Sequence, residues 1–578
     1  MRIHSPFLLT CGAALLIGLH AGKATAQQTP DTSIRHAYTK TMGENLFVLG
    51  KVWGFLKYYH PAVAAGKYDW DSVLIRLLPE YCKVRTKKER DALLEKWVED
   101  LGPVPVCAKC NDSLLKSAWL KPDFSWINGH NFPPALMTRL LYIRDNRRVD
   151  TPYHFIQVYT DGHSNFLLPQ HEATYTNLVY PSDPYALLSL FRFWNAVEYW
   201  YPYKYSLSVP WDGVLRQFIP VMLTHRNVVD YTLDVQAMVA FLHDSHGFFL
   251  SGTDTVTGKY YMPIILNLVE GRAFVTGITM KTLAEKAGIR VGDLVEAVDG
   301  EKIADLVARL TPYCPSSTQG SLYSKLSKEL VRSHNLVSRV RILRNGVSLD
   351  LTVTNFSPLL PPDLYRAYFA YPKDTAFCLI RDGMGYINIG KFKRKDSLAL
   401  KTLVGRTTSL IIDLRQNQDE VFGTGGGDIV GRLILPPGRP FVKMAYPQPS
   451  YPGVFTMGAP ADNDVSAPTA ADCYHGRIVL LVNQETMSVG EFLAMAFSGA
   501  PGAKVLGTPT AGADGAVFGL TVPGNISFWF TGLGVYYPDG RETQRIGIQP
   551  DILVKQTLNG YQSGTDEQLE AAVQYLSR

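Results

Sequence analysis

A single serine, Ser488, lies in the stretch NQETMSVGEF (residues 483–492), between small residues and directly after an apolar run. At a strand-to-helix turn a serine hydroxyl is exposed, and the N–H groups that follow it lie at the positive end of a helix, where they can stabilise an oxyanion. Ser488 is therefore a candidate nucleophile. Such a serine is more commonly the cap of the helix that begins there, so both roles are open at this point.

Two histidines are candidate general bases for this serine. His246 closes the run His-Asp-Ser-His at 243–246, and His163 lies in the stretch TDGHS among predicted strands and turns. The spacing of His243 and His246 also fits two metal ligands on a helix, but no third or fourth ligand lies nearby in the sequence. We predict His246 as the general base, with an exposed loop histidine as the alternative, and we expect no metal.

The residues around Ser488 alternate between short apolar runs and helical stretches. Four of the runs have the length of a strand; they begin at Gly385, Ser409, Arg477 and Lys504. This alternation predicts an α/β fold with its functional residues at the carboxyl ends of the strands. Unusual residues follow three of the runs, at 413–417, 486–491 and 507–512. The site is expected at these three ends.

An internal repeat occupies the N-terminal part of the chain. Residues separated by 141 positions match in pairs, among them Trp53 with Trp194, Pro61 with Pro202 and Trp70 with Trp211. The aromatic spacing predicts a helix in each copy that buries its aromatic face and ends at the proline. We expect a duplicated α+β region over residues 27–258.

The two copies of the repeat diverge directly after Leu101 and Leu242. The first copy continues as Gly-Pro-Val-Pro, whereas the second continues with the run that ends at His246. A repeat that needs only packing does not require histidine there. The divergence therefore favours a functional role for His246.

Residues 262–355 show a different pattern, with short predicted strands. A short helix is predicted after Thr282, and the Asp299-Gly300 pair predicts a tight hairpin turn. The stretch AGIRVGDLVEAVDG resembles the hallmark of a PDZ domain, with an insertion at about 304–335. The resemblance implies an open sheet edge that binds the end of a polypeptide as an added strand. A structural spacer with an occluded groove is the alternative.

Four motifs follow one another in the C-terminal half. They are Asp413, Leu414, Arg415 and Asn417; Thr486, Ser488, Gly490 and Glu491; Gly507, Thr510 and Gly512; and Gly547, Ile548, Pro550, Asp551 and Ile552. In these motifs the chain resembles the C-terminal processing and tricorn-core serine peptidases over about residues 262–554. The resemblance implies a multidomain α/β protein with a crotonase-like ββα catalytic domain at residues 363–578, a PDZ domain and the duplicated region.

The family activates its serine in two ways, and the chain fits one of them. Processing peptidases carry a lysine directly after the last glycine of the third motif, where this chain has Ala513. Tricorn-like members use a serine-histidine pair from an earlier domain, which Ser245 and His246 match. They also place an acid shortly before the last motif. Here Glu542 and Gln544 are the candidates, and Glu542 is preferred because alternate residues of a strand share a face.

Backbone N–H groups complete the expected site. The N–H of Val489, directly after the candidate nucleophile, is the first oxyanion donor that we expect. The second is expected from a run of three glycines, with Gly425 and Gly426 as candidates, because glycine lets the chain approach a substrate closely.

Net charge, the N-terminal segment and the cysteines indicate the compartment of the protein and the partners it can bind. The formal net charge of +5 over 578 residues argues against nucleic acid. Residues 1–26 combine Arg2, an apolar run and a small-residue end, and so predict a cleavable secretory signal and a periplasmic or extracellular protein. No later apolar run has the length of a membrane span. Cys107 and Cys110 are expected to form a local disulfide.

Together these features predict a secreted serine endopeptidase. Ser488 attacks a peptide carbonyl, His246 takes and returns the proton, and no metal or organic cofactor is required. The expected partner is a polypeptide or peptide substrate; the oligomeric state is left open. The alternative is a non-hydrolytic peptide- or ligand-binding protein on the same fold, because the retinoid-binding interphotoreceptor protein shares the fold of the family that this chain resembles. An esterase or amidase is a third possibility.

Overall fold

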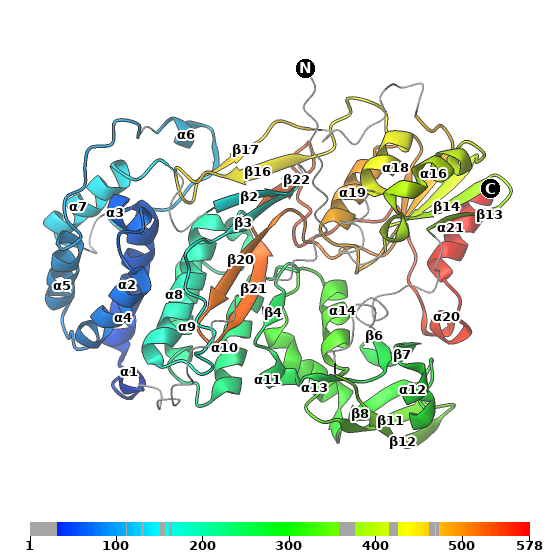
Figure 1. Ribbon diagram of the computed structural model, residues 1–578, viewed down its shortest axis with the longest axis horizontal. Coiled ribbons are helices and arrows are strands. Elements are labelled where there is room, and N and C mark those ends of the chain that lie inside the picture. The colour runs from blue at the N-terminus through cyan, green and yellow to red at the C-terminus, as the bar shows by residue number, and fades with distance from the viewer. Residues whose placement is uncertain are drawn as a thin grey trace.

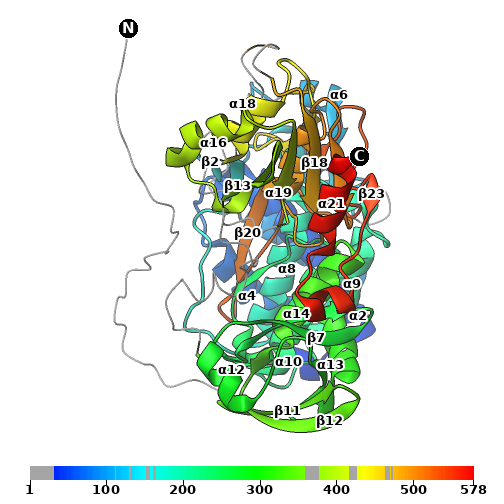
Figure 2. The same ribbon diagram turned by 90° about the vertical axis from the view of Figure 1, so that its right-hand side faces the viewer.

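The computed structural model describes residues 32–110, 112–128, 132–150, 156–160, 164–357, 376–415, 426–461, 469 and 473–578. Figures 1 and 2 show three parts: the helices of the N-terminal half, an α/β module, and a smaller β-rich module formed by the middle of the chain. The predicted signal segment, His163 and Gly425 lie outside the described residues.

The α/β module is built on a six-stranded sheet with the order β13-β14-β15-β18-β19-β23. Its strands are β13 (Phe377–Arg381), β14 (Met384–Asn388), β15 (Ser409–Asp413), β18 (Arg477–Val482), β19 (Lys504–Gly507) and β23 (Ile552–Leu553). Strands β14 to β23 pair in parallel, and β13 is antiparallel to β14. The four strands predicted from the apolar runs are confirmed, and they are neighbours in the sheet.

Helices cover both faces of this sheet. They are α16 (Ser397–Val404), α18 (Gly426–Ile434), α19 (Val489–Phe497) and α21 (Glu567–Ser577). Residues of α16, α18 and α19 share a core with Leu480, and residues of α21 share a second core with Val479 and Leu481. A strand that is buried on both faces needs apolar side chains at successive positions. This explains why β15 and β18 appear in the sequence as unbroken apolar runs.

The N-terminal half contains two sets of helices. The first set is α2 (Lys40–Tyr59), α4 (Trp70–Tyr81) and α5 (Lys87–Glu99), and the second is α8 (Asp183–Trp200), α9 (Trp211–Val221) and α10 (Val228–Ala240). Helices α2 and α8 are buried around most of their circumference and contact each other. Each ends two residues before a proline, as predicted from the sequence.

Two tryptophan pairs make the same contacts in the two sets. The rings of Trp53 and Trp70 stack with centroids 6.4 Å apart, and each indole N–H donates to the other residue's carbonyl, at 3.3 and 3.1 Å. Trp194 and Trp211 stack at 6.3 Å with the same reciprocal bonds, at 2.9 and 3.0 Å. Equivalent positions of the sequence repeat therefore occupy equivalent places in the fold.

The N-terminal half and the α/β module share two further sheets. One has the order β2-β3-β20-β21-β4 and the other β1-β17-β16-β22. Their strands are β1 (Ala118–Leu120), β2 (Ile156–Thr160), β3 (Ser164–Leu168), β4 (Phe249–Ser251), β16 (Lys443–Pro447), β17 (Phe455–Met457), β20 (Val517–Val522), β21 (Ile526–Thr531) and β22 (Gly534–Tyr536).

These two sheets join regions that are predicted from the sequence as separate domains. In Figure 1 the hairpin of β20 and β21 lies beside α8, and Phe528 and Phe530 belong to the same hydrophobic core as Phe193. The two regions form one packed body, because neither the hairpin nor the helices could bury their aromatic faces alone.

The β-rich module has its own core and a sheet with the order β12-β11-β8-β7-β6, with β9 beside β8. Its elements are β6 (Ile264–Val269), β7 (Arg272–Ile278), α12 (Lys281–Ala287), β8 (Leu294–Val298), β9 (Glu301–Lys302), α13 (Ile303–Leu310), α14 (Gln319–Glu329), β11 (Val337–Arg344) and β12 (Val347–Thr354). The hairpin predicted at Asp299 and Gly300 is present, and both residues have positive φ, 49° and 88°, as such a turn requires.

Helix α14 lies on the outer edge of β6 in this module. The Ser327 hydroxyl accepts the N–H of Leu268 at 3.0 Å, and Leu326 packs in the same core as Leu266. An edge strand presents unpaired backbone groups to any chain that can reach it. Here a side chain of α14 already hydrogen-bonds with a backbone N–H group of that edge.

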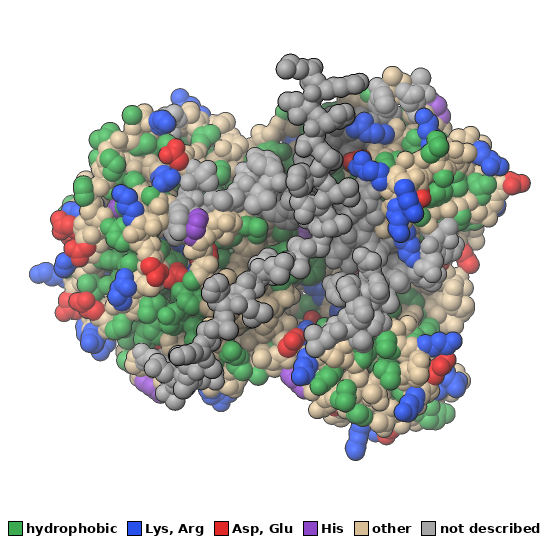
Figure 3. Space-filling model, in the orientation of Figure 1, with side chains coloured by type: hydrophobic (Ala, Val, Ile, Leu, Met, Phe, Trp, Pro, Cys, Tyr) green, Lys and Arg blue, Asp and Glu red, His purple; other side chains and the backbone are tan. Residues whose placement is uncertain are grey.

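Shorter elements connect these parts. They are α1 (Ser33–His36), α3 (Pro61–Ala64), α6 (Ser113–Lys116), α7 (Pro134–Asp145), α11 (Asp254–Thr257), β5 (Tyr260–Tyr261), β10 (Arg332–Ser333) and α20 (Leu558–Ser563). The disulfide predicted between Cys107 and Cys110 is present. Among the described helices, none combines the length and the apolar character needed to cross a membrane. Acidic and basic side chains both occur on the described surface in Figure 3, in keeping with the small net charge.

Candidate active site

Ser488 lies at the turn between β18 and α19, with φ 52° and ψ −122°. Positive φ is strained for a residue with a side chain, and a serine on such a strand-to-helix turn presents its hydroxyl at the top of the sheet. Ser488 occupies the N-cap position of α19, yet its side chain makes no capping hydrogen bond. The geometry therefore favours the nucleophile over the helix cap.

One segment, residues 511–513, holds both candidate catalytic loops. Its Ala513 carbonyl accepts the N–H of Ser488 at 2.8 Å, and its Ala511 carbonyl accepts the Ser245 hydroxyl at 2.9 Å. Because Ser245 directly precedes the candidate base, the turn that carries Ser488 and the loop that carries His246 are fixed to the same three residues.

Glu491 fixes this segment from the first turn of α19. The fully buried carboxylate accepts the backbone N–H groups of Gly512 and Ala513, both at 2.9 Å, and the hydroxyl of Thr510. Burial raises the pKa of Glu491 to about 7, although these hydrogen bonds favour the charged form. Glu491, a member of the serine motif, thus supports the site and does not face a substrate.

His246 lies in the loop between α10 and β4 and is 2% exposed. Its Nδ1 atom lies 2.8 Å from the hydroxyl oxygen of Thr531, the last residue of β21. Its Nε2 atom is buried and has no hydrogen-bond partner among the described residues. One ring nitrogen is engaged and the other is free, which is the arrangement that a general base needs.

Asp244, two residues before the histidine, is fully buried and accepts four hydrogen bonds. The donors are the N–H of Thr531 at 2.7 Å, the hydroxyl of Thr531 at 3.0 Å, the side-chain amide of Gln544 at 3.1 Å and the N–H of His246 at 3.0 Å. Sequence reasoning selected neither Asp244 nor Thr531. The Asp-x-His spacing was a usable signal for the aspartate, whereas Thr531 ends an ordinary strand and carries no signal.

Two charges act on the imidazole in addition to burial. Burial lowers the pKa of His246 below its ordinary value; the negative charge of Asp244 opposes this shift and the positive charge of Lys325 adds to it. Lys325 reaches the loop from α14 and donates to the carbonyl of Gly247 at 3.3 Å. The histidine is therefore neutral, and able to accept a proton, at neutral pH.

The sequence predicts that Ser245 orients His246, but the structure gives its hydroxyl other partners. The Ser245 hydroxyl, whose proton goes to the Ala511 carbonyl, lies 2.8 Å from the hydroxyl oxygen of Ser321 and accepts the N–H of Ser317 at 2.8 Å; both partners lie in the β-rich module. Ser245 therefore anchors the loop and does not hold the ring.

The structure gives the carboxylate of Glu542, the preferred acid, a partner other than the imidazole. An isolated bridge pairs Glu542 with Tyr536, and there its carboxylate accepts the hydroxyl of Tyr205 at 2.6 Å. Gln544 is the buried member of the pair, and its amide donates to Asp244 and not to the imidazole. Residues 542–544 do not form a strand, so the two side chains need not share a face, and the glutamine is the one that is buried.

The expected oxyanion donors lie at the starts of two helices. Val489 is the first residue of α19, so its N–H has no acceptor within the helix. Gly426 is the first residue of α18. Gly427 packs closely against α19, because a Cβ atom there would lie 2.7 Å from the side chain of Leu493. Gly425 lies outside the described residues.

Helix α14 of the β-rich module docks on the turn that precedes Ser488. Glu485 accepts a hydrogen bond from Ser324 and forms an ion pair with Lys328 at 2.9 Å. The same helix carries Ser321, a partner of the loop that holds the candidate base. The predicted insertion at about 304–335 therefore contacts both halves of the site.

Replacing Glu485 by alanine should loosen this docking. We expect the free energy of unfolding to fall by about 1–2 kcal/mol, because a buried serine loses its charged partner, and the amide protons of α14 to exchange faster. Urea denaturation and hydrogen exchange measure the two effects. Glu285→Ala, which removes a carboxylate from an exposed pair with Lys281, is the control and should change stability by less than about 0.5 kcal/mol. Equal effects of the two variants would contradict the docking role.

The first motif supports the sheet. The guanidinium of Arg415 pairs with Asp413 at 2.7 Å and with Asp566, just before α21, at 2.8 Å. The hydroxyl of Tyr386 donates to Asp413 at 2.8 Å. Asp413 and Arg415 thus fix the end of β15 to the C-terminal helix, which is a structural role; Asn417 of the same motif lies outside the described residues.

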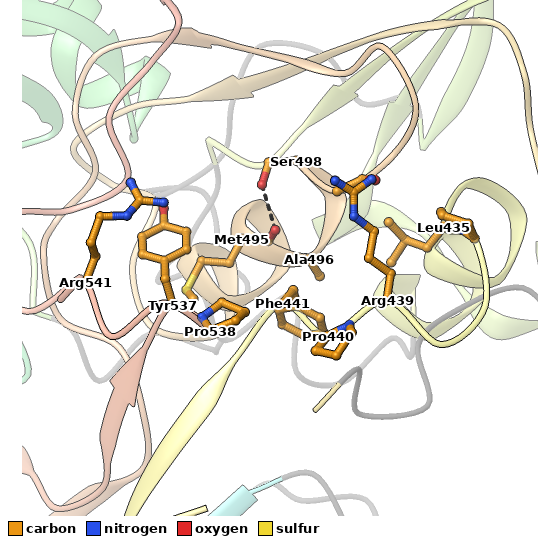
Figure 4. Close-up of a pocket in the computed structure, with 12 residues that line it drawn as sticks. Leu435, Arg439, Pro440, Phe441, Met495, Ala496, Ser498, Tyr537, Pro538 and Arg541 are labelled. Atoms are coloured by element: carbon orange, nitrogen blue, oxygen red, sulfur yellow. Dashed lines mark hydrogen bonds between the residues drawn. The ribbon is translucent and has the colours of Figure 1, made fainter. Parts of the chain in front are cut away.

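A cavity of about 200 Å³ lies away from this site. Figure 4 shows its lining, with Met495 and Ser498 from the C-terminal end of α19 and Arg439 and Arg541 on either side. Ser488 precedes the opposite end of the same helix. The cavity is therefore distinct from the candidate active site. The described residues also contain no cluster of three or more His, Cys, Asp or Glu side chains that could hold a metal ion.

Comparison with known proteins agrees with this geometry. Residues 383–554 match peptidase family S41. The structure of mature CPAF complexed with lactacystin is similar, with a TM-score of 0.50 and 14% identity, covering 68% of this chain and 97% of that chain. This similarity shows a shared fold. The family match and the serine turn together support a serine-type peptidase, a hydrolase acting on peptides.

Two other structures are similar at lower scores. The photosystem II D1 C-terminal processing protease has a TM-score of 0.35 and 18% identity, covering 64% of this chain and 92% of that chain. The tricorn protease has a TM-score of 0.32 and 17% identity, covering 73% of this chain and 40% of that chain. No protein of curated function matches the chain.

Proposed function

We propose that the chain is a serine endopeptidase in which Ser488 is the nucleophile and His246 the general base. One observation carries the proposal: Ser488, with its side chain free of any capping bond, and the loop of a buried histidine with a free Nε2 are bonded to the same segment, residues 511–513.

In this mechanism Nε2 of His246 takes the hydroxyl proton as Ser488 Oγ attacks the peptide carbonyl. The resulting oxyanion is stabilised by the N–H of Val489, at the positive end of α19, with a second donor from the glycines at 425–426. The imidazolium then protonates the leaving amine, and the acyl-enzyme forms. Water, deprotonated by the same nitrogen, hydrolyses the ester and restores Ser488.

We also propose that the chain is exported, that residues 262–355 form a PDZ domain and that the helical region arose by duplication. The signal-like segment at 1–26, the hairpin at Asp299 and Gly300, and the matching tryptophan pairs support these three proposals in turn. The groove of a PDZ domain would then bind the end of a polypeptide substrate.

Labelling with a fluorophosphonate tests the proposal. We expect one adduct, mapped by mass spectrometry to Ser488, no adduct in Ser488→Ala, and cleavage of casein by the wild type but not by Ser488→Ala. Ser498→Ala is the matched control, because this serine lies at the other end of α19, where its hydroxyl donates to the carbonyl of Met495 at 2.7 Å. A folded wild type that neither reacts nor cleaves would make the chain a non-hydrolytic binding protein.

A further inference from the structure

We propose that Thr531 and Asp244 orient His246, in the role that the sequence assigns to Glu542 or Gln544. The inference deepens the proposed peptidase function and rests on it. Both are positioning residues: they act through the histidine and do not touch a substrate. The pair would form a relay in which the hydroxyl of a threonine connects the imidazole to a buried carboxylate.

The hydrogen bonds fix the direction of this relay. A carboxylate can only accept, and a threonine hydroxyl has one proton to donate. The Thr531 hydroxyl lies 3.0 Å from Oδ1 of Asp244, so its proton points to the aspartate. Its remaining lone pairs face Nδ1 of His246 at 2.8 Å, so that nitrogen must be the one that carries hydrogen.

The tautomer follows from this direction. A neutral imidazole has one protonated nitrogen. With hydrogen on Nδ1, the lone pair lies on Nε2, the buried nitrogen that has no partner among the described residues. The relay therefore selects the tautomer of His246 that can take a proton from Ser488. After that transfer the negative charge of Asp244 stabilises the imidazolium through the hydroxyl.

The relay is rigid because its members are held by the backbone as well. The N–H of Thr531 donates to Oδ2 of Asp244 at 2.7 Å, and the N–H of His246 donates to Oδ1 at 3.0 Å. Strand β21, which ends at Thr531, pairs with β4, which begins three residues after the histidine. Both residues of the proposed relay are fully buried.

Gln544 also hydrogen-bonds with Asp244, the carboxylate of the proposed relay. Its amide nitrogen lies 3.1 Å from Oδ1 of Asp244. A glutamate at this position would bring a second negative charge against the buried aspartate, which is unfavourable. The glutamine therefore fits a site where Asp244 already supplies the charge.

Nitrogen-15 NMR of histidine-labelled protein tests the relay without using activity. The signals of His246 are assigned from a His246→Gln sample. We expect the wild type to carry its proton on Nδ1, and Thr531→Val to shift the equilibrium toward the Nε2-protonated tautomer. A wild-type histidine protonated on Nε2 overturns the proposal, and this measurement needs no variant at Thr531 to fold.

Kinetics give the second readout. Thr531→Val should lower kcat for peptide hydrolysis by at least about 10-fold with little change in KM, because the ring loses its orientation while the substrate surface stays. Thr531→Ser keeps the hydroxyl and should stay within about 3-fold of the wild type. Equal activity of the valine and serine variants overturns the relay. If the wild type is inactive but shows the Nδ1 tautomer, and the valine variant loses it, the peptidase proposal fails and the relay stands.

Discussion

A His246→Gln variant is expected to lose at least about 1,000-fold in kcat/KM for peptide hydrolysis and to keep its fold. The glutamine side chain can fill the buried space and still hydrogen-bond with Thr531. Its amide has no basic lone pair, however, so the proton of Ser488 has no acceptor. Initial rates on a fluorogenic peptide measure the loss, and the thermal unfolding midpoint checks the fold.

His243→Asn is the matched control for this variant. His243 lies three residues earlier in the same loop, is exposed and has a φ of 48°, a conformation that asparagine tolerates. We expect its kcat/KM to stay within about 2-fold of the wild type. Equal losses in the two variants would mean that the loop, and not the imidazole of His246, matters.

The pH dependence of kcat/KM provides a second check on His246. The base acts only when it is neutral, so its lowered pKa should place the acid limb of the profile below pH 6.5, the ordinary value for histidine. The charged groups that act on the ring are Asp244 in its own loop and Lys325 from α14, and they work in opposite directions. An acid limb at pH 6.5 or above would contradict the effect of burial.

The sheet and the serine turn could be predicted from the sequence because their signals are local. Strands β15 and β18 are buried on both faces, so their sequences are unbroken apolar runs. The turn at Ser488 follows one of these runs directly. His246 could be selected for a different reason: the two copies of the repeat diverge there, and only the second copy carries histidine.

The partners of the histidine could not be predicted because their contacts are distant in the chain. Thr531 is 285 residues from His246, and it reaches the ring only because β21 pairs with β4. Alternation along a strand suggested that Glu542 could share a face with Gln544. It could not show which of them is buried, since that depends on the contact of Glu542 with Tyr205 from the N-terminal half.

Replacing Glu491 by leucine is expected to lower both stability and activity. Leucine has similar size but no acceptor, so the N–H groups of Gly512 and Ala513 are left buried and unpaired. Each such group costs about 1–3 kcal/mol, and we expect a loss of about 2–6 kcal/mol in the free energy of unfolding, measured with urea. Activity should fall with it, because residues 511–513 hold the Ser488 turn and the loop of the candidate base.

Glu491→Gln separates hydrogen bonding from charge at this position. The amide oxygen retains one acceptor, so the stability of this variant should lie between that of the wild type and that of the leucine variant. The wild type should also lose stability as the pH rises from about 4.5 to about 7, because the pKa of Glu491 is raised in the folded state from its ordinary value of 4.5 to about 7, so the folded state binds the proton more tightly in this window. The glutamine variant cannot ionise here, so it should lose less stability over the same window. If the free energy of unfolding changed equally with pH in the wild type and the glutamine variant, the pKa of Glu491 would not be raised in the fold, and its hydrogen bonds to the 511–513 segment would balance the cost of burying its charge.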